Sequence, residues 1–315
     1  MTALRFVIGV DGGGSKTRAV ILPLPAAAAE RDTPSFVSGP SNLAAVGAER
    51  AGDAILRACD GVTTLSGCSR ADIAAVNVGV AGFSHEASRD AVLNRMRQAF
   101  PNASVSLVPD YIAAFDGALG GQPGIVVIAG TGQIAYGRNA QGDELRAGGY
   151  GHLIDDSGSG YGVGRRALAA ALASRDGSGA ATRLEALVLD SLAVSELSAV
   201  VAGVHGGAID RARIASLAPL VSDAAAEGDL AAMSILTETG RFLATLAIGI
   251  ATKLWEPGER FDVACAGGLW SSHHALTDAF TAAVAASKRT ALLVAPRYEP
   301  AIGAALAAAR EAGRL

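Results

Sequence analysis

The sequence is poor in aromatic residues, in charged residues and in long apolar runs, and each shortage limits the fold or the function that the chain can have. Aromatics make up 5% of the 315 residues although 50% are apolar. Alanine must therefore supply much of the core, and the helices should pack closely through small side chains. Half of the chain being apolar excludes intrinsic disorder. A net charge of −4 without a local Lys/Arg cluster argues against nucleic acid as a partner.

Cysteine is also scarce, and its placement excludes several kinds of site. Cys59, Cys68 and Cys265 form no CxxC pair and no metal-ligand spacing. Sparse thiols are typical of a reducing compartment. The apolar stretch at residues 6–10 is too short for a signal peptide, and the stretch at 242–251 is too short for a membrane span. We therefore expect a cytoplasmic protein with no membrane partner.

Glycine, by contrast, is abundant, and the 39 glycines gather in a few places. Residues 5–22 and 125–138 each predict a strand, a glycine turn and a second strand. The turns are Asp11-Gly12-Gly13-Gly14 and Gly130-Thr131-Gly132. We expect hairpin turns of this kind to need glycine at positive φ. Two such hairpins, each opening a region of alternating strands and helices, predict a duplicated α/β architecture.

The remaining elements follow from apolar periodicity. We expect strands at 73–80, 105–108 and 261–266, and helices at 45–58, 85–99, 164–174, 183–192, 195–203, 210–226, 229–254 and 301–310. A further helix should precede the last one, so that two helices close the chain. A chain of this length favours two domains. We place the first at residues 1–115 with the C-terminal helix 301–315, and the second, with a helical insertion, at 116–300.

The glycine turns are candidate phosphate sites, because their successive N–H groups can converge on an anion. At the first turn, Gly13 and Gly14 leave room for phosphate oxygens, while Ser15 and Lys16 add a hydroxyl and a charge. An ordinary tight hairpin is the alternative. The second turn, with Thr131 and Gly132, repeats the pattern and favours a nucleotide clamp.

Two further features support nucleotide binding. Asp11 ends a buried strand, where a carboxylate is costly unless it binds something, and Mg²⁺ held through water is the natural partner beside phosphates. Gly267 and Gly268 follow the strand at 261–266, where the absence of side chains permits close approach of a flat ligand such as adenine.

Three segments together resemble the N-acetylglucosamine kinase family, which lies in the BadF/BadG/BcrA/BcrD ATPase group of the actin/hexokinase/Hsp70 superfamily. They are residues 10–17 (VDGGGSKT), 128–132 (IAGTG) and, most specifically, 148–161 (GGYGHLIDDSGSGY). The resemblance implies two actin-like (ribonuclease H-like) α/β lobes with a nucleotide and sugar cleft between them. It also implies an enzyme that uses ATP and Mg²⁺ to phosphorylate an amino sugar, assembled as a homodimer.

The resemblance also implies roles for individual residues. Asp110 matches the catalytic base, and it could equally cap the helix that follows it; the two roles are compatible. The sugar ligands would be Asn42, Asp110, Gly149, Tyr150, Gly151 and Asp156. The matched nucleotide contacts are Ser15, Thr131, Ala215, Gly267 and Gly268.

This chain departs from the family pattern in the most specific segment. Tyr150 stands where the family usually has Trp, and Asp155-Asp156-Ser157-Gly158 stands where Gly-Asp-Glu-Gly is common. One or both of Asp155 and Asp156 could instead cap the helix expected near Gly164 or simply be solvated. The expected product is N-acetyl-D-glucosamine 6-phosphate. Free glucosamine is the alternative substrate, since the shifted Asp155 could accept its ammonium group.

Two rival functions from other classes share this ATPase core. An activator of 2-hydroxyacyl-CoA dehydratases would need cysteines for an iron–sulfur cluster, and the three present are widely separated. A sugar sensor that binds without phosphorylating would have no need of a base such as Asp110.

Overall fold

The computed structural model describes residues 5–24, 33–83 and 86–313, which form two compact units. Unit 1 is drawn from Met1–Pro123 and Ala295–Leu315, and unit 2 from Gly124–Val294. The domain boundaries predicted above, which assign residues 1–115 and 301–315 to one domain and 116–300 to the other, stay a prediction.

Unit 1 contains a five-stranded sheet in the order β3-β2-β1-β4-β5. The strands β1, β2 and β3 are antiparallel neighbours, whereas β4 and β5 run parallel to β1. The strands are β1 (Arg5–Gly12), β2 (Thr17–Leu24), β3 (Ser35–Ser38), β4 (Ile73–Val80) and β5 (Ser104–Pro109). The helices are α1 (Leu43–Leu65), the short η1 (Arg70–Asp72), α2 (Glu86–Ala99), α3 (Asp110–Leu119) and α11 (Pro300–Ala312). The helix predicted over 85–99 is confirmed from Glu86 to Ala99, and His85 lies outside the described residues.

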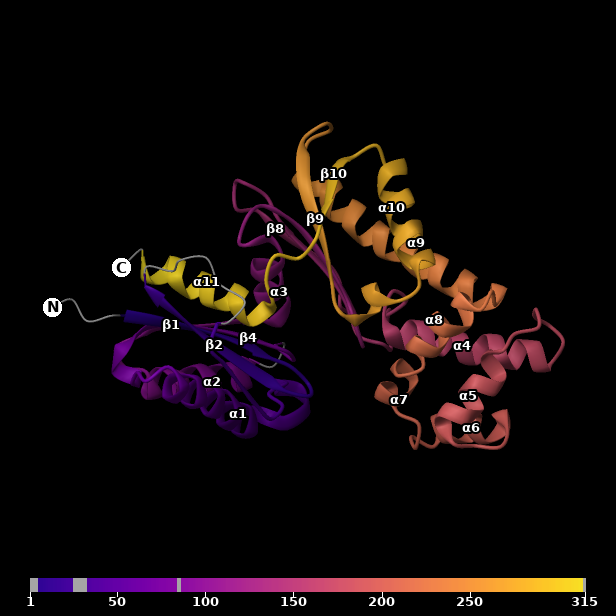
Figure 1. Ribbon diagram of the computed structural model, residues 1–315, viewed down its shortest axis with the longest axis horizontal. Helices are drawn as coiled ribbons and strands as arrows, with labels where there is room; N and C mark the ends of the chain where they lie inside the picture. The colour runs from indigo at the N-terminus through magenta and orange to yellow at the C-terminus, as the bar shows by residue number, and fades with distance from the viewer. Residues whose placement is uncertain (1–4, 25–32, 84–85, 314–315) are drawn as a thin grey trace. The chain divides into compact units, whose positions relative to one another are not determined.

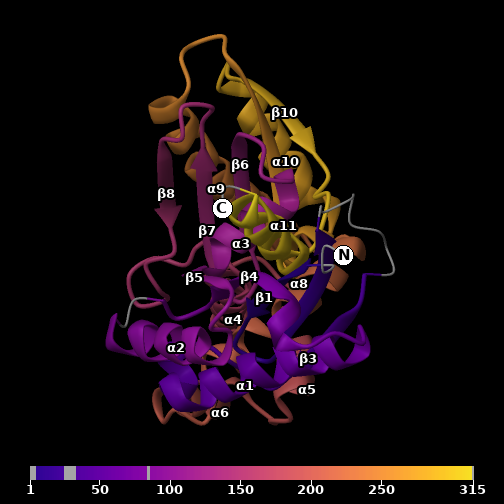
Figure 2. The same ribbon diagram turned by 90° about the vertical axis from the view of Figure 1, so that its left-hand side faces the viewer.

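Helices cover both faces of this sheet, which is why its central strands are apolar on both sides. Ile8 and Val10 of β1 pack with α1 and α2, whereas Val7 packs with the C-terminal helix α11. Figure 1 shows α11 on the face of this sheet opposite α1 and α2, and Figure 2 shows α1 and α2 side by side beneath it. The two ends of the chain therefore build one unit.

Unit 2 repeats the sheet of unit 1. Its order is β10-β9-β6-β7-β8, in which β6, β7 and β8 are antiparallel neighbours while β9 and β10 run parallel to β6. The strands are β6 (Gly124–Ala129), β7 (Gln133–Arg138), β8 (Glu144–Gly148), β9 (Arg260–Ala266) and β10 (Thr290–Val294). This match in order and direction confirms the predicted duplication of an α/β architecture.

The helices of unit 2 correct several predicted boundaries. They are α4 (Gly160–Arg175), α5 (Leu184–Leu192), α6 (Leu197–His205), α7 (Arg211–Ala215), α8 (Ala218–Ala226), α9 (Leu230–Leu254), the short η2 (Gly268–Ser271) and α10 (His274–Ala286). The single helix predicted over 210–226 is wrong, because Pro219 in the first turn of α8 has no N–H to continue α7. Helix α4 starts at Gly160 because Ser159 caps it.

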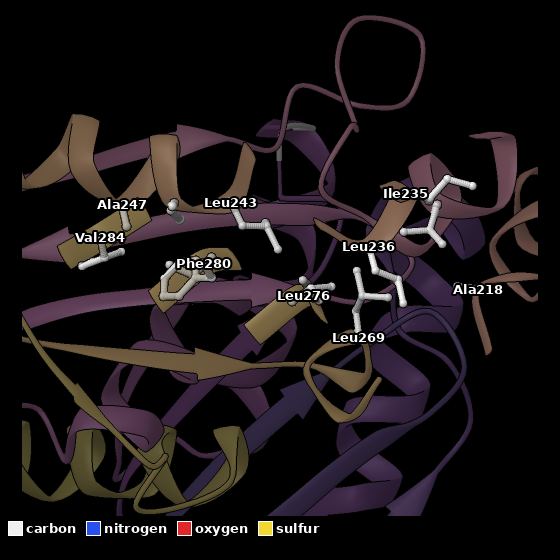
Figure 3. Packing of buried hydrophobic residues seen from close by; sticks show 14 of the residues in the cluster. Ala218, Ile235, Leu236, Leu243, Ala247, Leu269, Leu276, Phe280 and Val284 are labelled. Atoms are coloured by element: carbon white, nitrogen blue, oxygen red, sulfur yellow. The ribbon is translucent and has the colours of Figure 1, made fainter. Parts of the chain in front are cut away.

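The core of unit 2 holds part of the site in place. Figure 3 shows Leu236, Leu269 and Leu276 gathered in one apolar cluster. Leu269 belongs to η2, so this cluster anchors the turn that follows β9.

Among the described residues no single helix has the length and apolarity to cross a membrane, although α5 and α6, bent by 57°, pass that test as a pair by length and composition.

Candidate active site

Two carboxylates lie at one edge of the unit 1 sheet. Gly12 of β1 is in register with Val80 of β4, and Val80 is in register with Pro109 of β5. The three parallel strands therefore end together, which places Asp11 and Asp110 at their carboxyl ends. In α/β sheets this edge is where ligands bind.

The electrostatics of this edge disfavour two ionised carboxylates. Burial raises the pKa of Asp11 to about 6, the nearby Asp110 adds to that rise, and Lys16 opposes it. Burial also raises the pKa of Asp110, although its Oδ1 accepts a hydrogen bond from the Tyr111 N–H at 2.9 Å. Asp110 is thus a carboxylate with increased affinity for a proton, as a general base requires.

The carboxyl-end edge of the unit 1 sheet, with Asp11 and Asp110, also suits a divalent cation whose remaining ligands are water and phosphate oxygens. A cation would offset the repulsion between Asp11 and Asp110. Among the residues that the structure describes, no group of three or more His, Cys, Asp or Glu side chains could form a complete metal site. This donor set suits Mg²⁺, which keeps several waters and takes the rest of its ligands from phosphates.

The first glycine turn is open to solvent, but its glycines do not have the backbone conformation that the sequence predicted. Gly12, Gly13 and Gly14 all lie outside the positive-φ region, so the expected left-handed turn is wrong, and the same holds for Gly130 and Gly132. The requirement is space: a Cβ on Gly12 would lie 2.4 Å from Ser41 Oγ, whereas one on Gly14 would meet no atom within 4 Å. The turn therefore leaves its backbone accessible.

The same turn positions Asn42. The Gly13 carbonyl accepts hydrogen bonds from the N–H groups of Ser41 and Asn42 at 3.0 and 3.1 Å. Asn42 is the N-cap of α1, and its Oδ1 accepts from the N–H groups of Ala44 and Ala45. Its Nδ2 is thus the group that could donate to a ligand.

Unit 2 contains a cavity of about 630 Å³ that brings together three predicted nucleotide residues. Thr131 of the β6–β7 turn, Ala215 at the end of α7 and Gly268 of η2 all line it. Gly130 and Gly160 line it as well, and the Gly160 N–H donates to the Gly130 carbonyl at 2.7 Å. The volume falls within the range of small-molecule sites.

Gly267, the residue before η2, must be glycine on two grounds. Its φ is 100°, and a Cβ there would lie 2.4 Å from the Ala129 carbonyl oxygen. This close approach of β9 to the end of β6 directs η2 toward the cavity. The predicted turn after β9 therefore contributes to the cavity wall at Gly268, a residue without a side chain.

Several polar residues of this cavity were not predicted. Ser222 and Asp223 of α8 and Ser272 after η2 line it, and the His273 N–H donates to Ser222 Oγ at 2.8 Å. In the sequence these residues belong to ordinary helical periodicity. No local pattern distinguishes them from other polar positions of an amphipathic helix.

The loop after β8 presents the predicted sugar residues. Gly149 and Gly151 have φ of 71° and 87°, and Tyr150 between them is 54% exposed. The Arg146 guanidinium lies 5.6 Å from the centre of the Tyr150 ring. His152 packs edge-on against the Tyr161 ring at 5.3 Å, as a structural histidine would.

The two neighbouring aspartates have different surroundings. Asp155 Oδ1 accepts from the Ser157 N–H and Oγ, at 3.2 and 2.9 Å. Asp156 is buried, and its oxygens accept from Gln133 N–H at 3.1 Å and Arg211 Nη2 at 2.8 Å. The alternative that either of them caps the next helix is wrong, since Ser159 does so. The sugar-binding role of Asp156 stays a prediction.

Comparison with known proteins places the whole chain among related sequences. Residues 8–308 match the BadF/BadG/BcrA/BcrD ATPase family. The chain is 30% identical over 309 residues to the N-acetylmuramic acid/N-acetylglucosamine kinase of Clostridium acetobutylicum, covering 98% of this chain and 99% of that one. It is 28% identical over 312 residues to the N-acetyl-D-glucosamine kinase of Dictyostelium discoideum, covering 96% and 97%.

A solved structure agrees with these relatives. A candidate N-acetylglucosamine kinase from Chromobacterium violaceum superposes with a TM-score of 0.77 at 30% identity, over 97% of this chain and 99% of that one. The likeness thus extends over both units.

Proposed function

Because the chain belongs to the BadF/BadG/BcrA/BcrD ATPase family, we propose that it transfers the γ-phosphoryl group of ATP to the 6-hydroxyl of N-acetyl-D-glucosamine. The expectation of a sugar kinase is confirmed by the two curated relatives, which are both named for that activity. The observation that carries the proposal for this chain is Asp110, a carboxylate of raised pKa at the carboxyl end of β5.

In this mechanism Asp110 acts as the general base. The sugar O6 forms a bond to the γ-phosphorus while the bond from that phosphorus to the β–γ bridging oxygen breaks, and ADP leaves. The O6 proton passes to the Asp110 carboxylate. Hydrogen bonding from the Tyr111 N–H to Oδ1 fixes the orientation of this carboxylate at the start of α3.

The negative charge of the phosphates would be compensated by backbone N–H groups, by Lys16 and by a cation that Asp11 would hold. The accessible turns at Gly13–Lys16 and Gly130–Gly132 offer N–H groups, and Lys16 offers a cation. Asp11 is the residue that would hold Mg²⁺ through water, and the ion when bound would neutralise charge on the transferred phosphoryl group.

Glucosamine is the second candidate substrate, favoured by the position of Asp155. This residue lines a smaller cavity of about 290 Å³ beside the Tyr150 loop, together with His152 and Arg165. A carboxylate there could pair with the ammonium group of the free amino sugar.

Comparing sugars distinguishes these candidates. We expect kcat/KM for N-acetylglucosamine to exceed that for glucosamine and glucose by about tenfold or more, since a site that hydrogen-bonds the acetamido group is left with unpaired polar groups by sugars that lack it. N-acetylmannosamine keeps the acetamido group with the opposite configuration at C2, so it tests whether the site recognises the direction of that group. A coupled ADP-release assay measures this. If glucosamine is the better substrate, and Asp155→Asn lowers its use selectively, the substrate assignment changes. If the protein forms no ADP from ATP in the presence of any of these sugars, the proposed function is wrong.

The accessible backbone of Gly130 gives a prediction about the nucleotide. A Cβ on Gly130 would contact no atom within 4 Å, so Gly130→Ala should fold normally while its methyl group enters the cavity. We expect KM for ATP to rise about tenfold, which corresponds to roughly 1.4 kcal/mol. The melting temperature should stay within about 2 °C. Gly249→Ala, at an exposed and equally uncrowded position of α9, is the control for KM, which it should leave unchanged. Its melting temperature should rise slightly, because alanine has the higher helix propensity. An unchanged KM in Gly130→Ala would count against ATP binding in this cavity.

Other expected properties stay predictions. We propose a cytoplasmic homodimer, which light scattering of the purified protein and cell fractionation would check. The rival dehydratase activator would need cysteine ligands for an iron–sulfur cluster, and among the described residues no three His, Cys, Asp or Glu side chains gather into a group that could hold a metal ion.

A further inference from the structure

An ion pair of Arg211 joins the loop at residues 149–156, which carries the predicted sugar ligands, to the wall of the unit 2 cavity. Arg211 is the first residue of α7, a short helix capped by Asp210. Its Nη2 lies 2.8 Å from Asp156 Oδ2. The Asp156 side chain is 3% exposed, so this carboxylate depends on Arg211 for charge compensation.

The same contact reaches the second glycine turn. The other oxygen of Asp156 accepts from the Gln133 N–H, the first residue after that turn. A Cβ at position 132 would lie 3.0 Å from Arg211 Nη2, so glycine there admits the guanidinium. One ion pair thus connects three segments: the turn at 130–133, the loop that carries Tyr150, and α7.

Helix α7 extends this connection to the cavity. Ala212, next to Arg211, and Ala215, at the far end of the helix, both line the cavity, as do Gly130 and Thr131. A ligand in the cavity therefore contacts both partners that hold Asp156, namely the turn and α7.

The hydrogen bonding around this ion pair is incomplete. Among the residues that the structure describes, Arg211 Nε and Gln133 Nε2 are buried and have no hydrogen-bond partner. Buried donors in native proteins are normally paired with protein groups or ordered water, so both of these donors can take a further partner.

We propose that Arg211 is a positioning residue that couples nucleotide binding to amino-sugar binding, through Asp156 and the turn at 130–133. The inference rests on the proposed function, with the nucleotide in the cavity, and on the predicted role of Asp156 as an acceptor of hydrogen bonds from sugar hydroxyls. A phosphate seated on the turn orders its backbone, and with it the Gln133 N–H and the guanidinium that orient Asp156. The sugar then binds a carboxylate that is already in place, and by linkage the sugar strengthens nucleotide binding by the same factor.

Calorimetric titration tests this coupling without turnover. N-acetylglucosamine is titrated into the full-length protein with and without a saturating non-hydrolysable ATP analogue and Mg²⁺. In the wild type we expect the analogue to raise sugar affinity by at least about fivefold. In Arg211→Gln this factor should fall to about one, whereas Arg211→Lys, which keeps the charge, should retain part of it.

Matched variants separate coupling from folding. Arg213→Gln alters the same short helix at an exposed arginine whose Nη2 contacts the Leu192 carbonyl at 3.4 Å, and it should keep the full coupling. Combining Arg211→Gln with Asp156→Asn should give no further loss beyond Asp156→Asn alone, because both act through one contact. Thermal melts confirm that each variant is folded.

The outcomes are distinct. If Arg211→Gln is folded and retains the wild-type coupling factor, the inference is wrong. It is also wrong if Arg211→Gln only lowers the melting temperature while the separate affinities and their ratio are unchanged. If the wild type itself binds neither the sugar nor the analogue, the proposed function fails first, and the wild-type titration alone shows this.

Discussion

Replacing Asp110 with Asn is expected to lower kcat by a factor of about 10²–10⁴, the usual contribution of a general base. The amide cannot accept the O6 proton at neutral pH. Its oxygen can still accept the Tyr111 N–H, so the start of α3 should remain intact. Affinity for N-acetylglucosamine should change by no more than about twofold, since the lost interaction serves the transition state.

Steady-state kinetics and calorimetric titration of the sugar check this expectation. Asp90→Asn is the matched control, because Asp90 is an exposed aspartate of α2 in the same unit and should leave kcat unchanged. A near-normal kcat in Asp110→Asn would refute the base assignment. The alternative that Asp110 is the N-cap of the helix that follows it is wrong, because Pro109 occupies that position and Asp110 is the first residue of α3. A kcat loss accompanied by a clearly lower melting temperature would instead indicate that Asp110 serves mainly to stabilise the first turn of α3.

The sequence was sufficient for those parts of the fold that depend on local pattern. The strand at 73–80 is buried throughout, and its continuous apolar run predicts this without tertiary information. The glycine hairpins predicted the repeated sheet, because each forms the first antiparallel pair of its unit. The position of Asp110 followed in the same way, since the residue after a parallel strand lies at the edge where ligands bind.

Elements whose side chains face solvent escaped prediction. Strands β8 and β10 form the two opposite edges of the unit 2 sheet. In β10 even the apolar residues Leu292 and Leu293 are exposed. An edge strand needs no alternating apolar face, so periodicity did not distinguish these segments from loops.

Site features that depend on distant contacts were also missed. Arg211 and Asp156 are 55 residues apart in the chain, and only the fold brings them together. The glycines of the two phosphate turns were predicted for the wrong reason: the tight packing of Gly12 against Ser41, 29 positions later, requires the absence of a side chain and not a positive φ. Spacing within a motif carries no information about such neighbours.

Replacing Asp11 with Asn is expected to make the protein more stable at neutral pH and nearly inactive. In the folded protein burial, reinforced by Asp110, raises the pKa of Asp11 from 3.8 to about 6. The folded state therefore binds a proton at Asp11 more tightly than the unfolded state does. Consequently the free energy of unfolding falls as the pH rises from about 4 to about 6, and stays lowered above that. Asn carries no charge at any pH and avoids this loss.

The magnitude follows from the size of the shift. A change of about two pKa units corresponds to roughly 3 kcal/mol at pH 7, and the difference between variant and wild type should vanish below about pH 4. Urea unfolding at several pH values, in the absence of Mg²⁺ and nucleotide, measures it, with Asp90→Asn as a control that should show no pH-dependent gain. An Asp11→Asn protein that is less stable than the wild type at pH 7 would contradict the expectation.

The same variant should also lose activity. A carboxylate that destabilises the folded protein at neutral pH is difficult to explain by packing, because a neutral side chain of the same shape would serve the fold better. Its ionised form should be needed for a cation that approaches with the nucleotide. We therefore expect Asp11→Asn to lower kcat/KM for ATP with Mg²⁺ by about 10²-fold or more, about the loss expected when a preorganised charge contact is removed. Stability and activity should change in opposite directions, and a variant that gains stability yet keeps full activity would assign Asp11 no part in the reaction.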